Sequence, residues 1–167
     1  MTLKYDHIVG RKFIYGKQDC YALLRDFYSE NFGIILPNYA RPNNFWKFNL
    51  NMYMDRYLKN GFDVLHCHPS EYRPGDVFLM AIESEVANHV GVLVENGQIL
   101  HHLWNRPAVV EPYRTLLRNT TVGVVRHKDV KLEQVATTGD LLDYVNPSVR
   151  RKLNEHIERN QLPYEPV

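Results

Sequence analysis

The stretch that decides the fold is His89-Val90-Gly91-Val92-Leu93-Val94-Glu95-Asn96-Gly97-Gln98-Ile99-Leu100-His101. Two apolar runs flank Asn96-Gly97, a pair typical of tight turns, so the stretch predicts a β-hairpin with a histidine at each end. About 70 residues upstream, Gly16-Lys17-Gln18-Asp19-Cys20 leads directly into a predicted helix. A cysteine at a helix start and two hairpin histidines are the residue types of a thiol nucleophile, its base and an orienting group.

The length of the hairpin loop decides which histidine shares a face with His89. A two-residue loop, Asn96-Gly97, places His89 on the same face as His102. A three-residue loop that begins at Glu95, with Gly97 left-handed as a bulge, pairs His89 with His101 instead. The pattern alone leaves both registers open.

Helical periodicity precedes the hairpin, and further strand-like runs surround it. Apolar residues recur at helical spacing over residues 19–31, with Asp19 as the expected N-cap and Gly33 as the expected end. A second helix is predicted over residues 45–59. Helices followed by strands with hairpin connections predict an α+β fold with a mainly antiparallel sheet. The expected strands cover residues 62–65, 77–81, 90–94, 98–103, 108–110 and 121–126.

The last 39 residues differ in character from the rest of the chain. Apolar positions at helical spacing, broken at Asn146-Pro147, predict two short helices. We therefore expect one domain over residues 1–128 and a helical C-terminal extension over residues 129–167.

Composition excludes several classes of protein. The net charge is +1 and no Lys/Arg block occurs, which argues against nucleic-acid or anionic-membrane binding. No apolar run is long enough to span a membrane, and residues 1–10 lack the apolar core of a signal peptide. The two cysteines are too few for a disulfide framework. We expect a chain made in a cytoplasm that needs another carrier to reach an external substrate.

Cys20 has two interpretations on position alone. Free cysteine is commonly a small buried hydrophobe, and Cys20 falls on the apolar face of its helix. In the first helical turn, however, unsatisfied N–H groups and the helix dipole are expected to lower the thiol pKa and to stabilise an oxyanion.

Motifs in four places resemble those of the NlpC family of cell-wall cysteine peptidases. The likeness covers about residues 5–128 and implies a papain-like fold. The motifs are Gly16-x-x-Asp19-Cys20 before a helix, Pro74-Gly75-Asp76-Val77-Phe78 before a strand, His89-Val90-Gly91-Val92, and Leu100-His101.

The resemblance implies acyl transfer by a Cys-His-His triad. Cys20 would be the nucleophile, His89 the base and His101 the residue that orients His89. The spacing from His89 to His101 matches the family pattern and favours His101 over His102, which remains the alternative. The bond implied lies in the peptidoglycan stem peptide, often between D-glutamate and a diamino acid, and its cleavage needs no metal or organic cofactor.

Two further residues near the cysteine follow from the same resemblance. Tyr15 matches a family tyrosine that helps to build the oxyanion site, and Asp19 is assigned to the same oxyanion or substrate-binding region. Tyr21 departs from the family pattern, because a small residue usually follows the cysteine. This departure affects the expected substrate specificity.

A narrower likeness points to the tail-assembly branch of this family in tailed bacteriophages. It rests on His101-His102-Leu103 with Arg106 and Tyr113 downstream. The branch implies a virion component at the tail tip, made in the host cytoplasm, with peptidoglycan peptide and other tail-tip proteins as partners. The alternative is a structural assembly module in which the peptidase fold serves mainly for binding.

A zinc site is a further alternative for the histidine-rich segment. His66-Cys67-His68 is dense in zinc-ligand types, and His66 and His68 would share one face of a strand. With His101 or His102 they could complete a metal site. No second paired-ligand spacing accompanies the segment, so this hypothesis ranks below the peptidase.

Overall fold

The computed structural model describes residues 2–132 together with residues 151, 152 and 155. The compact unit that ends at Leu132 carries all of the features described below. Most of the predicted C-terminal extension lies outside the described residues, although the backbone is helical at 151, 152 and 155. Within the described part of the chain, no helix combines the length and apolar character needed to cross a bilayer.

Helix α1 (Cys20–Phe32) begins after the predicted cap and ends before Gly33, close to the expected bounds. The Asp19 carboxylate accepts a hydrogen bond from the backbone N–H of Ala22 at 2.9 Å, which satisfies one free donor of the first turn. Gly33 ends the helix in the left-handed conformation at φ 67°. Leu24 and Phe27 are fully buried, so the apolar face of α1 fixes the start of the helix against the sheet.

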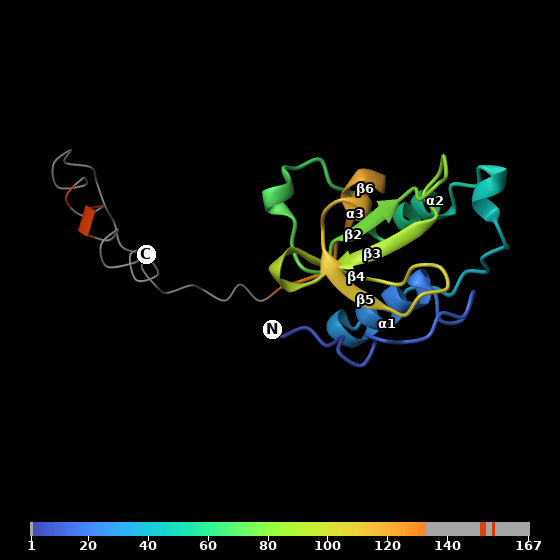
Figure 1. Ribbon diagram of the computed structural model, residues 1–167, viewed down its shortest axis with the longest axis horizontal. Helices are drawn as coiled ribbons and strands as arrows, with labels where there is room; N and C mark the ends of the chain where they lie inside the picture. The colour runs from blue at the N-terminus through green and yellow to red at the C-terminus, as the bar shows by residue number, and fades with distance from the viewer. Residues whose placement is uncertain (1, 133–150, 153–154, 156–167) are drawn as a thin grey trace. The chain divides into compact units, whose positions relative to one another are not determined.

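One six-stranded sheet forms the centre of the fold, in the order β1-β6-β2-β3-β4-β5. Every pair of neighbouring strands is antiparallel, which confirms the α+β prediction. Helix α1 lies along one face and contacts β3 and β4 (Figure 1). The strands are β1 (Phe62–Val64), β2 (Val77–Met80), β3 (His89–Leu93), β4 (Gln98–His101), β5 (Val109–Pro112) and β6 (Thr121–His127).

The second predicted helix is divided in two. Residues 45–59 contain a 3-10 turn, η1 (Phe45–Phe48), and a separate helix, α2 (Met52–Lys59). Asn49 adopts a left-handed conformation at φ 53°, which interrupts the helical backbone between them. Three short elements were not expected from the sequence: η2 (Pro69–Glu71), η3 (Glu95–Gly97) and α3 (Leu116–Thr120).

The hairpin of β3 and β4 has the three-residue loop. Val94 N–H donates to the Gln98 carbonyl at 2.8 Å, so residues 95–97 form the connection. Gly97 is left-handed at φ 67°, as the longer loop requires. Of the two registers that the sequence left open, the structure adopts the one that places His89 and His101 on one face.

Gly91 allows β4, which carries His101, to pack closely against β3. Gly91 lies directly opposite His101 and two residues after His89, so all three share one face of the sheet. A Cβ atom on Gly91 would lie 2.5 Å from Ile99 Cγ2 and 3.1 Å from His101 Cβ. The close packing of β4 against β3 therefore depends on the absence of a side chain at this position.

Candidate active site

A cavity of about 390 Å³ opens at the first turn of α1 and is lined by both Cys20 and His89. Aromatic side chains supply much of its wall. Trp46 and Trp104 meet edge to face there, with ring centroids 6.1 Å apart and an interplanar angle of 73°. The aromatic lining comprises Phe13, Tyr15, Phe45, Trp46, Tyr53 and Trp104.

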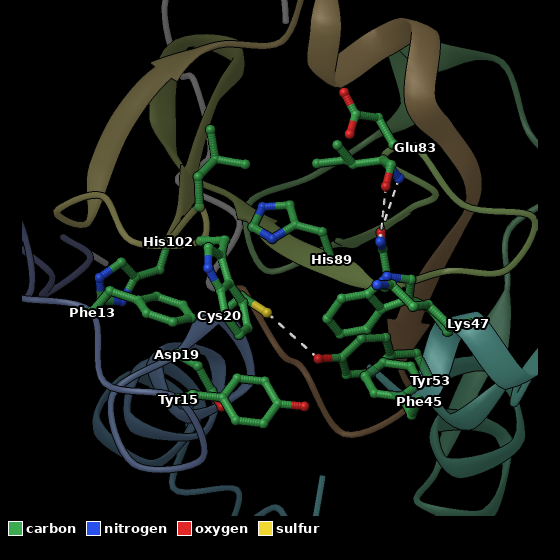
Figure 2. A pocket seen from close by; sticks show the side chains of 15 residues that line it. Phe13, Tyr15, Asp19, Cys20, Phe45, Lys47, Tyr53, Glu83, His89 and His102 are labelled. Atoms are coloured by element: carbon green, nitrogen blue, oxygen red, sulfur yellow. Dashed lines mark hydrogen bonds between the residues drawn. The ribbon is translucent and has the colours of Figure 1, made fainter. Parts of the chain in front are cut away.

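His89 and His101 form a buried hydrogen-bonded pair. His89 Nε2 lies 3.1 Å from His101 Nδ1, and the second nitrogen of His101, Nε2, lies 2.9 Å from Glu111 Oε1. Figure 2 shows the His89 ring on the side of the cavity that faces the Cys20 sulfur. Because Nε2 of His89 is engaged by His101, Nδ1 is the remaining free nitrogen of the His89 ring.

The Cys20 thiol is held in its neutral form. Its residue is 7% exposed, and its sulfur lies 3.5 Å from the Tyr53 hydroxyl. Burial and, to a smaller extent, the charge of Asp19 raise the pKa of Cys20 to about 11, against the opposing effect of the Tyr53 hydroxyl. The expectation that the helix start lowers this pKa is wrong, because burial and the Asp19 charge raise the pKa instead.

His89 is neutral for a related reason. Burial, with smaller contributions from charge on His101 and His102, lowers the pKa of His89 to about 3. With a thiol of high pKa and an imidazole of low pKa in the same cavity, both groups are neutral at neutral pH. Transfer of the thiol proton to His89 would then have to accompany attack by the sulfur rather than precede it.

Asp19 lines the cavity, but its carboxylate is occupied by groups of the protein. Besides the Ala22 N–H, it accepts hydrogen bonds from the Gly16 N–H at 2.8 Å and from Arg41 Nε at 2.7 Å. The side chains of Asp19 and Arg41 are each 3% exposed. The ion pair ties the loop at residue 41 to the start of α1, which gives Asp19 a structural part beside the predicted oxyanion region.

Tyr15 and Tyr53 supply two hydroxyl groups near the cavity. The Tyr15 hydroxyl donates to the Pro42 carbonyl at 2.9 Å, while its ring packs on Trp104 with centroids 5.1 Å apart. The Tyr53 hydroxyl is the one that contacts the Cys20 sulfur (Figure 2). Sequence reasoning missed Tyr53, since the helical spacing of α2 indicates a buried stripe but not which hydroxyl faces the thiol.

His102 lies at another part of the cavity lining. Its ring is fully buried and packs edge-on against Phe13, with ring centroids 5.3 Å apart, and no side chain of the described residues bonds to it. Its neighbour His101 takes the position beside His89. The register of the hairpin thus places two adjacent histidines in different surroundings.

The segment His66-Cys67-His68 does not contribute to this site. His68 Nδ1 accepts a hydrogen bond from the Ser70 N–H at 3.3 Å and caps η2. Among residues 2–132, no three histidine, cysteine or acidic side chains are grouped closely enough to hold a metal ion. The zinc hypothesis therefore gains no support from the geometry.

Comparison with known proteins identifies the family. Residues 10–126 match the sequence model of the NlpC/P60 family. The chain belongs to this family. The matched range includes every NlpC/P60 motif quoted above and all three residues of the expected triad.

Two phage proteins are similar to this NlpC/P60 chain. Tail tip assembly protein K of Escherichia phage lambda is 34% identical over 122 residues, which cover 73% of this chain and 60% of that protein. Tail tip assembly protein K of Escherichia phage N15 is 30% identical over 126 residues, covering 74% and 51% respectively. The chain therefore spans between half and two thirds of these relatives, and the expected likeness to the phage-tail branch is confirmed.

Solved structures of the family show the same fold. A lipoprotein-like NLP/P60 family protein of Staphylococcus aureus aligns with a TM-score of 0.51 at 17% identity, over 75% of this chain and 39% of that one. An NlpC/P60 family protein of Bacillus cereus aligns with a TM-score of 0.50 at 17% identity, over 74% and 37%. The expected papain-like NlpC fold is thus confirmed.

Proposed function

We propose that this NlpC/P60 chain is a cysteine peptidase of a phage tail tip that cleaves an amide bond in the peptidoglycan stem peptide. The observation that carries the proposal is the hydrogen bond from His89 Nε2 to His101 Nδ1, which leaves Nδ1 of His89 for the cavity that contains Cys20. The family supplies the reaction class, and the phage relatives supply the biological setting.

The reaction proceeds in two halves. The Cys20 sulfur attacks the carbonyl carbon while its proton passes to His89, and the tetrahedral intermediate collapses when His89 protonates the leaving amine. His89 then takes a proton from water, and the resulting hydroxide attacks the thioester. Collapse of this second intermediate releases a carboxylic acid, and the Cys20 thiolate recovers its proton from His89.

The developing oxyanion needs donors close to the sulfur. The backbone N–H of Cys20 lies in the first turn of α1, and the Tyr53 hydroxyl contacts the thiol. Each such donor commonly contributes about 3 kcal/mol to transition-state stabilisation. In this arrangement Tyr53 takes the role expected of Tyr15, whose own O–H donates to Pro42.

The decisive experiment incubates the purified protein with bacterial sacculi and identifies the released muropeptides by mass spectrometry. Release should be lost in Cys20→Ala and retained in Cys67→Ala, which removes the other free cysteine of the described chain. Release that survives Cys20→Ala would contradict the peptidase. No release from any preparation would favour the alternative, an assembly module that uses the fold for binding.

The two adjacent histidines offer a second matched comparison. His101→Ala should abolish cleavage because it removes the partner of His89, whereas His102→Ala removes a ring with no hydrogen bond to the pair. A greater loss of activity in His102→Ala than in His101→Ala would show that the assignment of the third residue is wrong.

The setting in the virion is tested separately. We propose that residues 129–167 connect the peptidase domain to other tail-tip proteins. Val130 packs against the core, so the truncation is best made after Leu132, where the compact unit ends. The truncated protein should still cleave stem peptides in vitro, but purified tails of phage that encode it should lack the protein. Normal incorporation of the shortened protein would contradict the docking role.

A further inference from the structure

Glu111 extends the histidine pair on the side away from the thiol. In the register of β4 and β5, Ile99 pairs with Glu111 and His101 pairs with Val109, so Glu111 and His101 lie diagonally on one face. Glu111 Oε1 is 2.9 Å from His101 Nε2. The His101 side chain is fully buried, and that of Glu111 is 47% exposed, at the edge strand of the sheet.

The chemistry of these three groups fixes where the protons lie. A carboxylate only accepts hydrogen bonds, so Nε2 of His101 must carry the proton in its bond to Glu111. Neutral imidazole has one N–H, and Nδ1 of His101 is therefore the acceptor from His89 Nε2. The proton of His89 then resides on Nε2, and Nδ1 is unprotonated.

An imidazolium at His101 would keep the bond to Glu111 but reverse the bond to His89, because Nδ1 would then donate to His89 Nε2. Burial lowers the pKa of His101, while the charge of Glu111 and its hydrogen bond raise it. Burial is the largest of these effects, which favours the neutral ring. The carboxylate of Glu111 therefore sets the direction of its own bond to His101 and, through the neutral His101 ring, the direction of the bond between His101 and His89.

We propose that Glu111 is a positioning residue that selects the Nε2–H tautomer of both His101 and His89. Its consequence for catalysis rests on the proposed function: only this tautomer leaves Nδ1 of His89 unprotonated, and therefore able to accept the proton of Cys20. Glu111 touches neither the thiol nor a substrate. It acts through two imidazole rings in series.

The direct test observes the tautomers in the intact chain without a substrate. Long-range proton–nitrogen correlation spectra of isotope-labelled histidine distinguish Nε2–H, Nδ1–H and doubly protonated rings. At neutral pH, both His89 and His101 should show the Nε2–H form. A doubly protonated or Nδ1–H form of His101 in the unsubstituted protein would overturn the proposal.

Glu111→Gln tests the cause of the selection. An amide can donate as well as accept, so the Nδ1–H tautomer of His101 becomes accessible and the proton of His89 moves to Nδ1. We expect Nδ1–H signals from both rings in this variant. Asp63→Asn is the control, since Asp63 is an exposed acidic residue on β1, the opposite edge of the sheet. Unchanged tautomers in Glu111→Gln would overturn the proposal.

Kinetics separate this inference from the proposed function. For stem-peptide cleavage, Glu111→Gln should lower kcat by about 10- to 100-fold, with KM within about twofold, because substrate contacts remain intact. If the protein shows the expected tautomers but cleaves no stem peptide, the proposed peptidase activity is wrong, whereas the selection of the tautomers by Glu111 is supported. A protein that cleaves with equal kcat in Glu111→Gln contradicts the role of Glu111 alone.

Discussion

Alkylation of Cys20 should accelerate about tenfold for each unit of pH between 7 and 10. Iodoacetamide reacts with the thiolate, and burial raises the pKa of Cys20 to about 11. The thiolate fraction is then about one in ten thousand at pH 7 and about one in ten at pH 10. The predicted gain in rate over this interval is therefore about a thousandfold.

The assay uses the Cys67→Ser variant, in which Cys20 is the remaining cysteine. Intact-protein mass spectrometry follows the single adduct, and circular dichroism confirms that the protein stays folded at each pH. Adding Tyr53→Phe removes a hydrogen bond that lowers the pKa of Cys20, so alkylation below pH 10 should become slower still.

A rate that reaches its plateau below pH 8 would refute this reasoning. It would mean that the thiolate exists before the substrate binds, as part of an ion pair with His89. The mechanism would then begin from a charged nucleophile, and the low pKa of His89 would be incorrect.

Three further perturbations test neighbouring parts of the site. Asp19→Asn removes a charge that raises the pKa of Cys20, so alkylation at pH 8 should be faster. The same substitution leaves the charge of Arg41 buried without its acidic partner, so the free energy of unfolding measured in urea should fall by about 3–5 kcal/mol. Between pH 7 and pH 4, the free energy of unfolding should fall by about 3 kcal/mol less in His89→Gln than in the unsubstituted protein. The pKa of His89 in the folded protein, about 3, lies below its ordinary value of 6.5, so the stability that neutral His89 contributes is present above pH 6.5 and is lost as the pH falls towards 3. Gly91→Ala should lower the free energy of unfolding by about 1–3 kcal/mol, because the new Cβ would meet Ile99 at 2.5 Å; an unchanged melting temperature would contradict the hairpin register.

Local patterns were sufficient to predict most of the fold. Asp19 and Gly33 bound α1 because capping and left-handed termination are properties of single residues. The break at Asn49 was missed, since asparagine is compatible with a helix until neighbouring packing selects its left-handed conformation. The hairpin was predictable, but its loop length was not, because both turns accept Asn96-Gly97.

The motifs indicate candidate site residues but not their electrostatics. Cys20, His89 and His101 could be selected from motifs, but the pKa of Cys20 depends on burial, which arises only when distant segments pack. Glu111 was not identified for the same reason. Its relation to His101 requires the pairing of β4 with β5, and an isolated acidic residue in an edge strand usually indicates solvent exposure.

The edge-to-face contact of Trp46 and Trp104 gives the cavity an optical property. These are the two tryptophans of the whole chain, and both line the space in front of Cys20. A ligand that enters this space changes the surroundings of every indole in the protein at once. Intrinsic fluorescence therefore reports occupancy without a label. In a Cys20→Ala protein, it would allow muropeptides to be ranked by affinity while none is consumed.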